Sequence, residues 1–180
     1  MVATGISLFF LLLALTSINC VQIMFEQFRQ CSSNGVIDCN LRVRKINRTM
    51  AALYGNATVR MDLGKNFKTW FDAYHSPLGN NQYNLYPMRV PPMGVCDYLE
   101  RFWGDYYPYM VGYAPNLVKP GECPLSVRVV QFNDMILDPR MLPPYVPKGL
   151  WKLVWHANET GTDKYFLVEL TFKVYPDGHI

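Results

Sequence analysis

Residues 164–175 read KYFLVELTFKVY, and the expected fold is built around this stretch. Every second side chain in it is apolar: Phe166, Val168, Leu170, Phe172 and Val174. Alternation with a period of two is typical of a β-strand that buries one face and exposes the other. We therefore expect a half-buried strand over this stretch.

The preceding apolar stretch predicts the partner of that strand. Trp151, Leu153 and Trp155 share one face of residues 150–156. The residues between the two stretches, 157–162, are mostly small or polar, as in a loop. The two stretches are therefore predicted to form a hairpin.

The same period recurs along the chain. Residues 39–44 and 56–63 alternate, and residues 67–75 carry aromatic side chains on both faces. We predict that residues 23–30 pair with 39–44 as a hairpin, and that 125–137 form a further strand. Breaks in the pattern at Lys45-Ile46 and at Val129-Val130 predict a bulge and a change of phase. The chain is therefore predicted to be mainly β.

One segment follows the helical period. Its apolar residues are spaced i, i+3, i+4, i+7 and i+8. They are Val95, Tyr98, Leu99, Phe102 and Trp103. We expect one short amphipathic helix that ends at Gly104 as its cap. Residues 105–115 contain two prolines and a glycine, so an aromatic-rich loop is predicted there.

The first twenty residues have the layout of a secretory signal peptide. Residues 1–19 carry no charged side chain, and residues 6–15 are an apolar run with one serine. That run is shorter than a bilayer-spanning helix, although a permanent anchor is the alternative reading. We expect residues 1–20 to be removed and residues 21–180 to form a single secreted domain.

The cysteines fit an oxidising compartment. Cys20 lies at the expected cleavage junction, and its removal leaves an even number. The remaining four are Cys31, Cys39, Cys96 and Cys123. Three connectivities are possible; we expect Cys31–Cys39 and Cys96–Cys123, because each pair brackets a compact segment. In the alternative, Cys20 stays and is free or pairs between chains.

Three sequence motifs are acceptors for N-linked glycans. They begin at Asn47, Asn56 and Asn158. In an exported chain they predict a glycoprotein, provided that the asparagines face outward.

Several function classes have no support in the sequence. The net charge is +3, so we expect no nucleic-acid partner. His75, His156 and His179 share no metal-ligand spacing, and nucleophile-elbow, P-loop and dinucleotide motifs are absent from the sequence. We expect a protein that is not an enzyme and takes no metal or cofactor.

The order of motifs carries a resemblance to a known family. Val95-Cys96-Asp97-Tyr98-Leu99 is followed by Glu122-Cys123-Pro124-Leu125 and then by Pro147-Lys148-Gly149-Leu150-Trp151. This order resembles a large insect family of secreted proteins of unknown function that includes the chemosensory B-type proteins of taste hairs. It is similar to the ganglioside-activator proteins of the lipid-recognition superfamily. The resemblance extends from about Phe25 to Tyr175.

The resemblance implies a two-sheet antiparallel β-sandwich or cup, stapled by disulfides, with an apolar cavity and no catalysis. It implies a carrier or presenter of a lipid or hydrocarbon-like ligand, with a membrane receptor or channel and the membrane surface as further partners. We expect the ligand to contact two groups of residues. Those near the opening of the cavity are Trp103, Tyr107, Tyr109, Met110 and Tyr113, and those deeper inside are Phe71 and Trp151. The alternative is an interaction module that binds a receptor through the tyrosine-rich loop and has no cavity.

Overall fold

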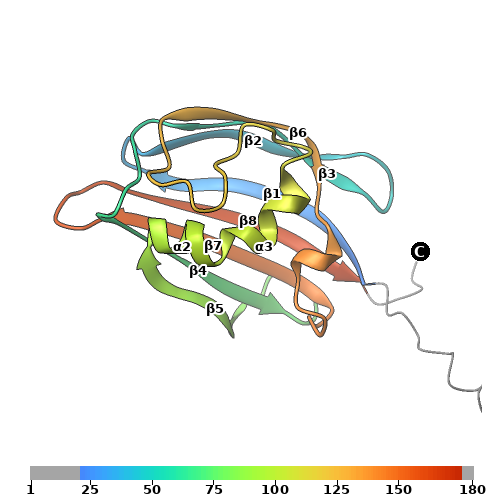
Figure 1. The fold of residues 1–180 in the computed structure, drawn as a ribbon. Helices are drawn as coiled ribbons and strands as arrows, with labels where there is room; N and C mark the ends of the chain where they lie inside the picture. Colours follow the sequence, from blue (N-terminus) through green and yellow to red (C-terminus); the bar gives the residue numbers. More distant parts are fainter. Residues whose placement is uncertain (1–20, 176–180) are drawn as a thin grey trace, which may run out of the picture.

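The computed structural model describes residues 21–175. A five-stranded sheet has the order β1-β8-β7-β4-β5, and a three-stranded sheet has the order β2-β3-β6 (Figure 1). The larger sheet contains β1 (Gln22–Ser33), β8 (Tyr165–Tyr175), β7 (Gly149–Glu159), β4 (Phe67–Ser76) and β5 (Asn84–Gly94). The smaller contains β2 (Ile37–Lys45), β3 (Ala51–Val59) and β6 (Arg128–Ile136). Helices α2 (Val95–Arg101), α3 (Trp103–Met110) and the 3-10 turn η2 (Pro139–Met141) complete these elements.

The two C-terminal stretches form the predicted hairpin. β7 and β8 pair antiparallel, with Trp151 opposite Phe172 and Trp155 opposite Val168. β4 pairs with the other edge of β7 and with β5, so the aromatic stretch 67–75 is an interior strand of the larger sheet. The mainly β prediction is confirmed.

The predicted hairpin of residues 23–30 with 39–44 is wrong. Both strands exist, but β1 pairs with β8 and β2 pairs with β3. The chain crosses from one sheet to the other after Ser33. Sequence alternation defines a buried face but does not select the partner strand, and here the partner of β1 is more than 130 residues away.

The predicted strand boundaries need three smaller corrections. β3 covers Ala51–Val59 rather than 56–63. The break at Lys45-Ile46 is the end of β2 and not a bulge, because the backbone turns there and Ile46 N–H donates to Met50 O at 2.9 Å. In β6 the buried phase changes at residues 133–134, where the register to β3 shifts, rather than at 129–130.

Strand β5 is not predicted by the sequence pattern. Its segment NLYPMRVPPMG contains three prolines, which cannot donate to a strand ladder. β5 lies at the edge of the five-stranded sheet, where one side of the strand needs no partner. The edge position of β5 therefore tolerates the prolines, and these prolines are the reason that the sequence does not indicate a strand.

The helical prediction is right in place and wrong in extent. α2 ends at Arg101, and a second helix begins at Trp103. Gly104 therefore lies inside α3 and is not a cap, and the expected loop after residue 104 is helical as far as Met110. Pro108 lies within α3 and removes one backbone donor. A helix of eight residues tolerates this loss because its side chains pack on neighbouring segments.

The three-stranded sheet and the two helices lie over the same face of the five-stranded sheet (Figure 1). Inward residues of the larger sheet, such as Trp151 and Phe172, join one core cluster with Leu53 of β3 and Phe132 of β6. Phe71 of β4 contacts Tyr98 of α2, with ring centroids 5.3 Å apart. We call this side of the larger sheet its inner face.

Some predictions fall on residues outside this description. The signal peptide, its cleavage after Cys20 and His179 lie outside residues 21–175. The backbone of Cys31 belongs to β1, but its side chain is outside the description, so the Cys31–Cys39 bridge stays a prediction. Within the described residues, the helices are too short or too polar to cross a bilayer.

Candidate functional site

The inner face is less tightly buried at its middle than at its ends. Along β7, Trp151 and Ala157 are only 1% and 2% exposed. Leu153 and Trp155 lie between them on the same face, in an interior strand, and are only partly buried. Interior strands covered by a second layer usually bury every inward side chain. The middle of β7 therefore faces space that water can reach.

The same pattern crosses both sheets. On β4, Phe71 is partly buried between the buried Thr69 and Ala73, and on β8, Leu170 is partly buried between Val168 and Phe172. Facing apolar residues of β1 and β2 are partly buried as well. We define the central belt as the partly buried residues Phe28, Leu41, Val43, Phe71, Leu153, Trp155 and Leu170.

Two closely packed clusters bound the central belt. One contains Phe25, Phe132, Trp151 and Phe172. The other contains Phe67, Leu99 and Phe166. Each cluster joins the inner face of the larger sheet to the layer above it. The belt is thus an apolar zone with both ends closed by packed side chains.

The helices form one wall beside the belt. Phe71 stacks on Trp155 with centroids 5.6 Å apart and contacts Tyr98 of α2. In α3, Met110 packs against the first cluster, yet every residue of this helix is at least partly exposed. Burial raises the pKa of Tyr106, and the charge of Asp105 adds to this shift. α3 therefore rests on the core as a shallow cover.

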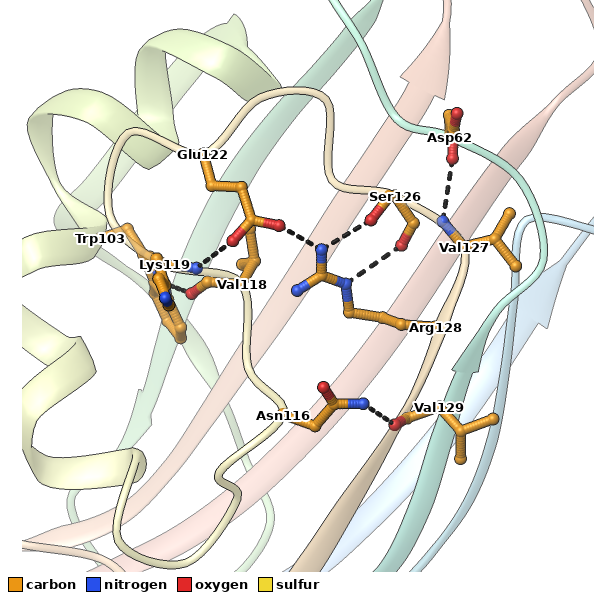
Figure 2. Close-up of polar contacts among 10 residues, drawn as sticks. All are labelled: Asp62, Trp103, Asn116, Val118, Lys119, Glu122, Ser126, Val127, Arg128 and Val129. Carbon is orange, nitrogen blue, oxygen red and sulfur yellow. Dashed lines mark hydrogen bonds and ion pairs between the residues drawn. The ribbon is translucent and has the colours of Figure 1, made fainter.

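A polar network holds this wall in place (Figure 2). The Glu122 carboxylate accepts from Lys119 N–H at 3.0 Å and pairs with Arg128, whose Nη2 also contacts Ser126 Oγ at 2.6 Å. The Lys119 N–H, and then the Arg128 guanidinium, lower the pKa of Glu122. Trp103 Nε1–H donates to Val118 O at 2.7 Å. The network ties α3 to the segment that leads into β6.

Two further contacts extend that attachment. Val127 N–H donates to Asp62 Oδ1 at 2.9 Å, and Asn116 Nδ2 donates to Val129 O at 2.8 Å (Figure 2). The predicted Cys96–Cys123 disulfide is present and links α2 to the same segment. The helical wall is therefore anchored, through this segment, to the smaller sheet.

The predicted ligand residues do not form one group. Phe71 belongs to the central belt, whereas Trp151 is buried in the first cluster and its Nε1–H donates to Pro147 O at 2.9 Å. Trp103 packs with the second cluster, and Tyr107 meets its ring edge-on at 6.3 Å. The remaining three, Tyr109, Met110 and Tyr113, lie on or just after α3, where Arg140 covers the Tyr109 ring at 5.0 Å.

Of the seven belt residues, sequence reasoning named only Phe71 as a site residue, and the six that it missed include Leu153, Trp155 and Leu170. Alternation placed these three on the inward faces of β7 and β8, which is correct. It gave no signal that they are less buried than their neighbours, because that depends on how closely the second layer approaches.

The motifs that carry the resemblance have structural roles. Gly149 has φ +127°, and a Cβ there would lie 2.5 Å from Ser76 O and 2.9 Å from His75 Nε2. Lys148 O accepts from His75 Nε2 at 2.9 Å. The Pro-x-Gly-x-Trp motif therefore builds the close approach of β7 to the end of β4.

The outer face of the larger sheet mixes polar and charged side chains with apolar ones such as Trp70 and the buried Val154. His156 lies 3.3 Å from Asp72 and stacks on Trp70 with ring centroids 4.8 Å apart. Burial lowers the pKa of His156, and Asp72 opposes this shift. A depression of about 510 Å³ on this face is lined by polar side chains such as Glu26, Asn81 and Thr171. It lies on the opposite side of the sheet from the belt and does not suit an apolar ligand.

Across residues 21–175, acidic, cysteine and histidine side chains do not gather into a group of three that could hold a metal ion.

The three glycan acceptors differ in how exposed they are. Asn47 is exposed in the β2–β3 turn, and its Oδ1 accepts from Thr49 N–H and Oγ1–H at 2.9 and 3.1 Å. Asn158 is exposed near the end of β7, and Asn56 is partly buried in the middle of β3.

Residues 66–153 match the model of a family described as a protein of unknown function (DUF1091). The matched segment contains β4, β5, both helices, the Cys96–Cys123 disulfide and Trp151. No curated protein matches the chain.

Proposed function

We propose, from the premise that residues 66–153 match the DUF1091 family, that this protein is a secreted, non-catalytic carrier or presenter of a lipid or hydrocarbon-like ligand. The observation that carries the proposal is the central belt. Leu153, Trp155 and Leu170 occupy inward positions of interior strands, yet they retain solvent-accessible surface. An apolar zone of this kind gains free energy when an apolar chain replaces water.

The energetics favour a ligand with a long hydrocarbon chain. Burial of each CH₂ contributes about 0.8 kcal/mol, so about eight to ten buried methylenes offset the entropy lost on binding. The belt residues are carbon-rich, and the surrounding clusters are apolar. Affinity would therefore rise with chain length, with head-group contacts at the partly exposed tyrosines of α3.

The resemblance to insect chemosensory and ganglioside-activator proteins extends this proposal. In such a role the protein would hold its ligand outside the cell and offer it to a membrane receptor or channel. The signal-peptide layout, the disulfide and the exposed glycan acceptors Asn47 and Asn158 are consistent with that location.

A second candidate is an interaction module that binds a receptor through α3. It is favoured by the absence of a fully buried residue in that helix, which leaves Trp103, Tyr107 and Tyr109 partly exposed. In that case the belt would close tightly in solution and take no ligand.

Displacement of a fluorescent fatty acid, dansylaminoundecanoic acid, distinguishes the two. We expect saturable binding to the wild-type protein and competition by long-chain fatty acids and alkanes. Leu170→Trp should fill the belt and weaken binding at least tenfold. Leu167→Trp is the matched control, because it enlarges the same strand on the outer face.

The result that contradicts the carrier is an absence of saturable binding, or equal binding by the two variants. A strongly destabilised Leu170→Trp together with no binding by the wild type would support the interaction module, because overpacking a filled core is costly.

A further inference from the structure

Two neighbouring turns at one end of the molecule display apolar side chains. In the β4–β5 connection, Gly79 N–H donates to Ser76 O at 3.1 Å, which closes a turn with Leu78 at its third position. Before β7, Val146 N–H donates to Pro143 O at 3.2 Å and places Tyr145 at the equivalent position. Leu78 is 84% exposed and Tyr145 is 91% exposed.

The first turn lies against the start of β7, which follows the second turn closely in the chain. A Cβ on Gly149 would lie 3.2 Å from Pro77 Cα, and one on Gly79 would lie 3.9 Å from Leu150 Cγ. Figure 1 shows the β4–β5 connection and the segment that leads into β7 at the same end of the larger sheet. Both turns have proline at the second position, which fixes φ and rigidifies the tip. Leu78 and Tyr145 are therefore exposed on rigid turns before any partner binds.

The charges around the tips are of both signs. Arg140 is paired with Asp138 at 2.7 Å, and Glu26 lines the same depression as Asn81 of the β4–β5 connection. The basic Lys148 lies directly before Gly149, whose backbone lies against Pro77 of the first turn. Leucine and tyrosine are highly exposed apolar residues at the third position of these turns, a position where polar residues such as asparagine and aspartate are common. Tyrosine favours the boundary between hydrocarbon and water, and lysine near an anionic membrane surface contributes to binding.

We propose that this end of the molecule docks on a lipid bilayer that carries anionic head groups, with Leu78 and Tyr145 inserted at the interface. A stable protein interface needs a continuous surface of about 800 Å² on each partner. Two convex tips offer no such surface, whereas a fluid bilayer adapts to them. This inference is independent of the ligand in the belt, which the tips do not line.

Co-sedimentation with vesicles of phosphatidylcholine alone, or with about 30% phosphatidylserine, tests the inference. We expect the wild-type protein to bind the anionic vesicles more tightly, and the affinity to fall as salt rises. Leu78→Ser/Tyr145→Ser should weaken binding about tenfold or more, since each buried apolar side chain is worth that order of affinity. Lys148→Gln should weaken it several-fold.

The matched control is Val127→Ser/Val129→Ser, which removes two exposed apolar side chains (59% and 51% exposed) from another part of the surface and should bind like wild type. Equal binding by the two double variants would overturn the inference, as would an absence of wild-type binding to both kinds of vesicle. The fatty-acid displacement assay, run without vesicles, should give the same result for the wild type and the tip variant. A failure of ligand binding is therefore separable from a failure of docking.

Discussion

The packing around His156 accounts for the presence of this polar residue in the larger sheet. Its ring stacks on Trp70 and its Nε2 lies 3.3 Å from Asp72, on the face of the sheet that is turned away from the belt. The site stabilises the neutral imidazole, because burial lowers its pKa more than Asp72 raises it. His156 thus contributes to packing as a neutral ring, and its protonation at low pH should destabilise the folded state.

That environment predicts a pH dependence of stability. The folded pKa of His156 lies below the unfolded value of about 6.5, so the unfolded chain takes up the proton first as the pH falls. The stabilisation is present above that value and declines between about pH 7 and pH 5. His156→Gln should remove this part of the decline. Melting temperatures of both proteins across that range measure it, and parallel curves would refute the assignment.

Gly149 is the residue whose substitution should be most revealing for the Pro-x-Gly-x-Trp motif. Its φ of +127° and the 2.5 Å distance at which an added Cβ would meet Ser76 O leave room only for hydrogen. Gly149→Ala should cost about 2 kcal/mol or more, through strain and displacement of β4. Gly112→Ala is the control, because nothing lies within 4 Å of its added Cβ. Urea unfolding compares them; equal losses would contradict the steric account.

Among the elements, the helical wall depends most on its attachments. α2 is short, α3 has no fully buried residue, and an interior proline weakens α3. The disulfide and the hydrogen bond from Trp103 Nε1–H to Val118 O connect this wall to the segment before β6. The wall should therefore be the first part to loosen when an attachment is removed.

Cys96→Ala/Cys123→Ala tests that expectation. The bridge closes a 27-residue separation, so its loss should lower the free energy of unfolding by about 3 kcal/mol. Hydrogen exchange should accelerate in residues 95–123 more than in β7 and β8. Unchanged exchange in the wall would show that packing alone holds it.

The elements also show what can and cannot be predicted from sequence. Strands with clean alternation, such as β2 and β8, are predictable because one face is more deeply buried and the other is more exposed. β5 and α3 are not predictable in this way. Pro87 locally disfavours a strand and Pro108 locally disfavours a helix, and the position of each element in the tertiary structure overrides that local preference. The pairing of β1 with β8 escapes prediction because it joins distant parts of the chain.

At the scale of the whole molecule, the larger sheet forms one layer, and the smaller sheet and the helices together form a second layer over its inner face (Figure 1). The segment that matches the family, residues 66–153, contributes helices α2 and α3, the disulfide that holds them, the interior strand β4 and the first part of β7. The central belt combines side chains of the larger sheet with Leu41 and Val43 of the smaller sheet. Its position could not be predicted from the sequence, because it depends on the distance between layers.

Native mass spectrometry of the protein secreted from insect cells tests the carrier proposal itself. A carrier should give a folded ion heavier than the polypeptide and its glycans by the mass of a bound lipid or hydrocarbon. That excess should disappear on denaturation, be absent from Leu170→Trp and persist in Leu167→Trp. Identical native and denatured masses, after incubation with long-chain fatty acids and alkanes, would contradict it.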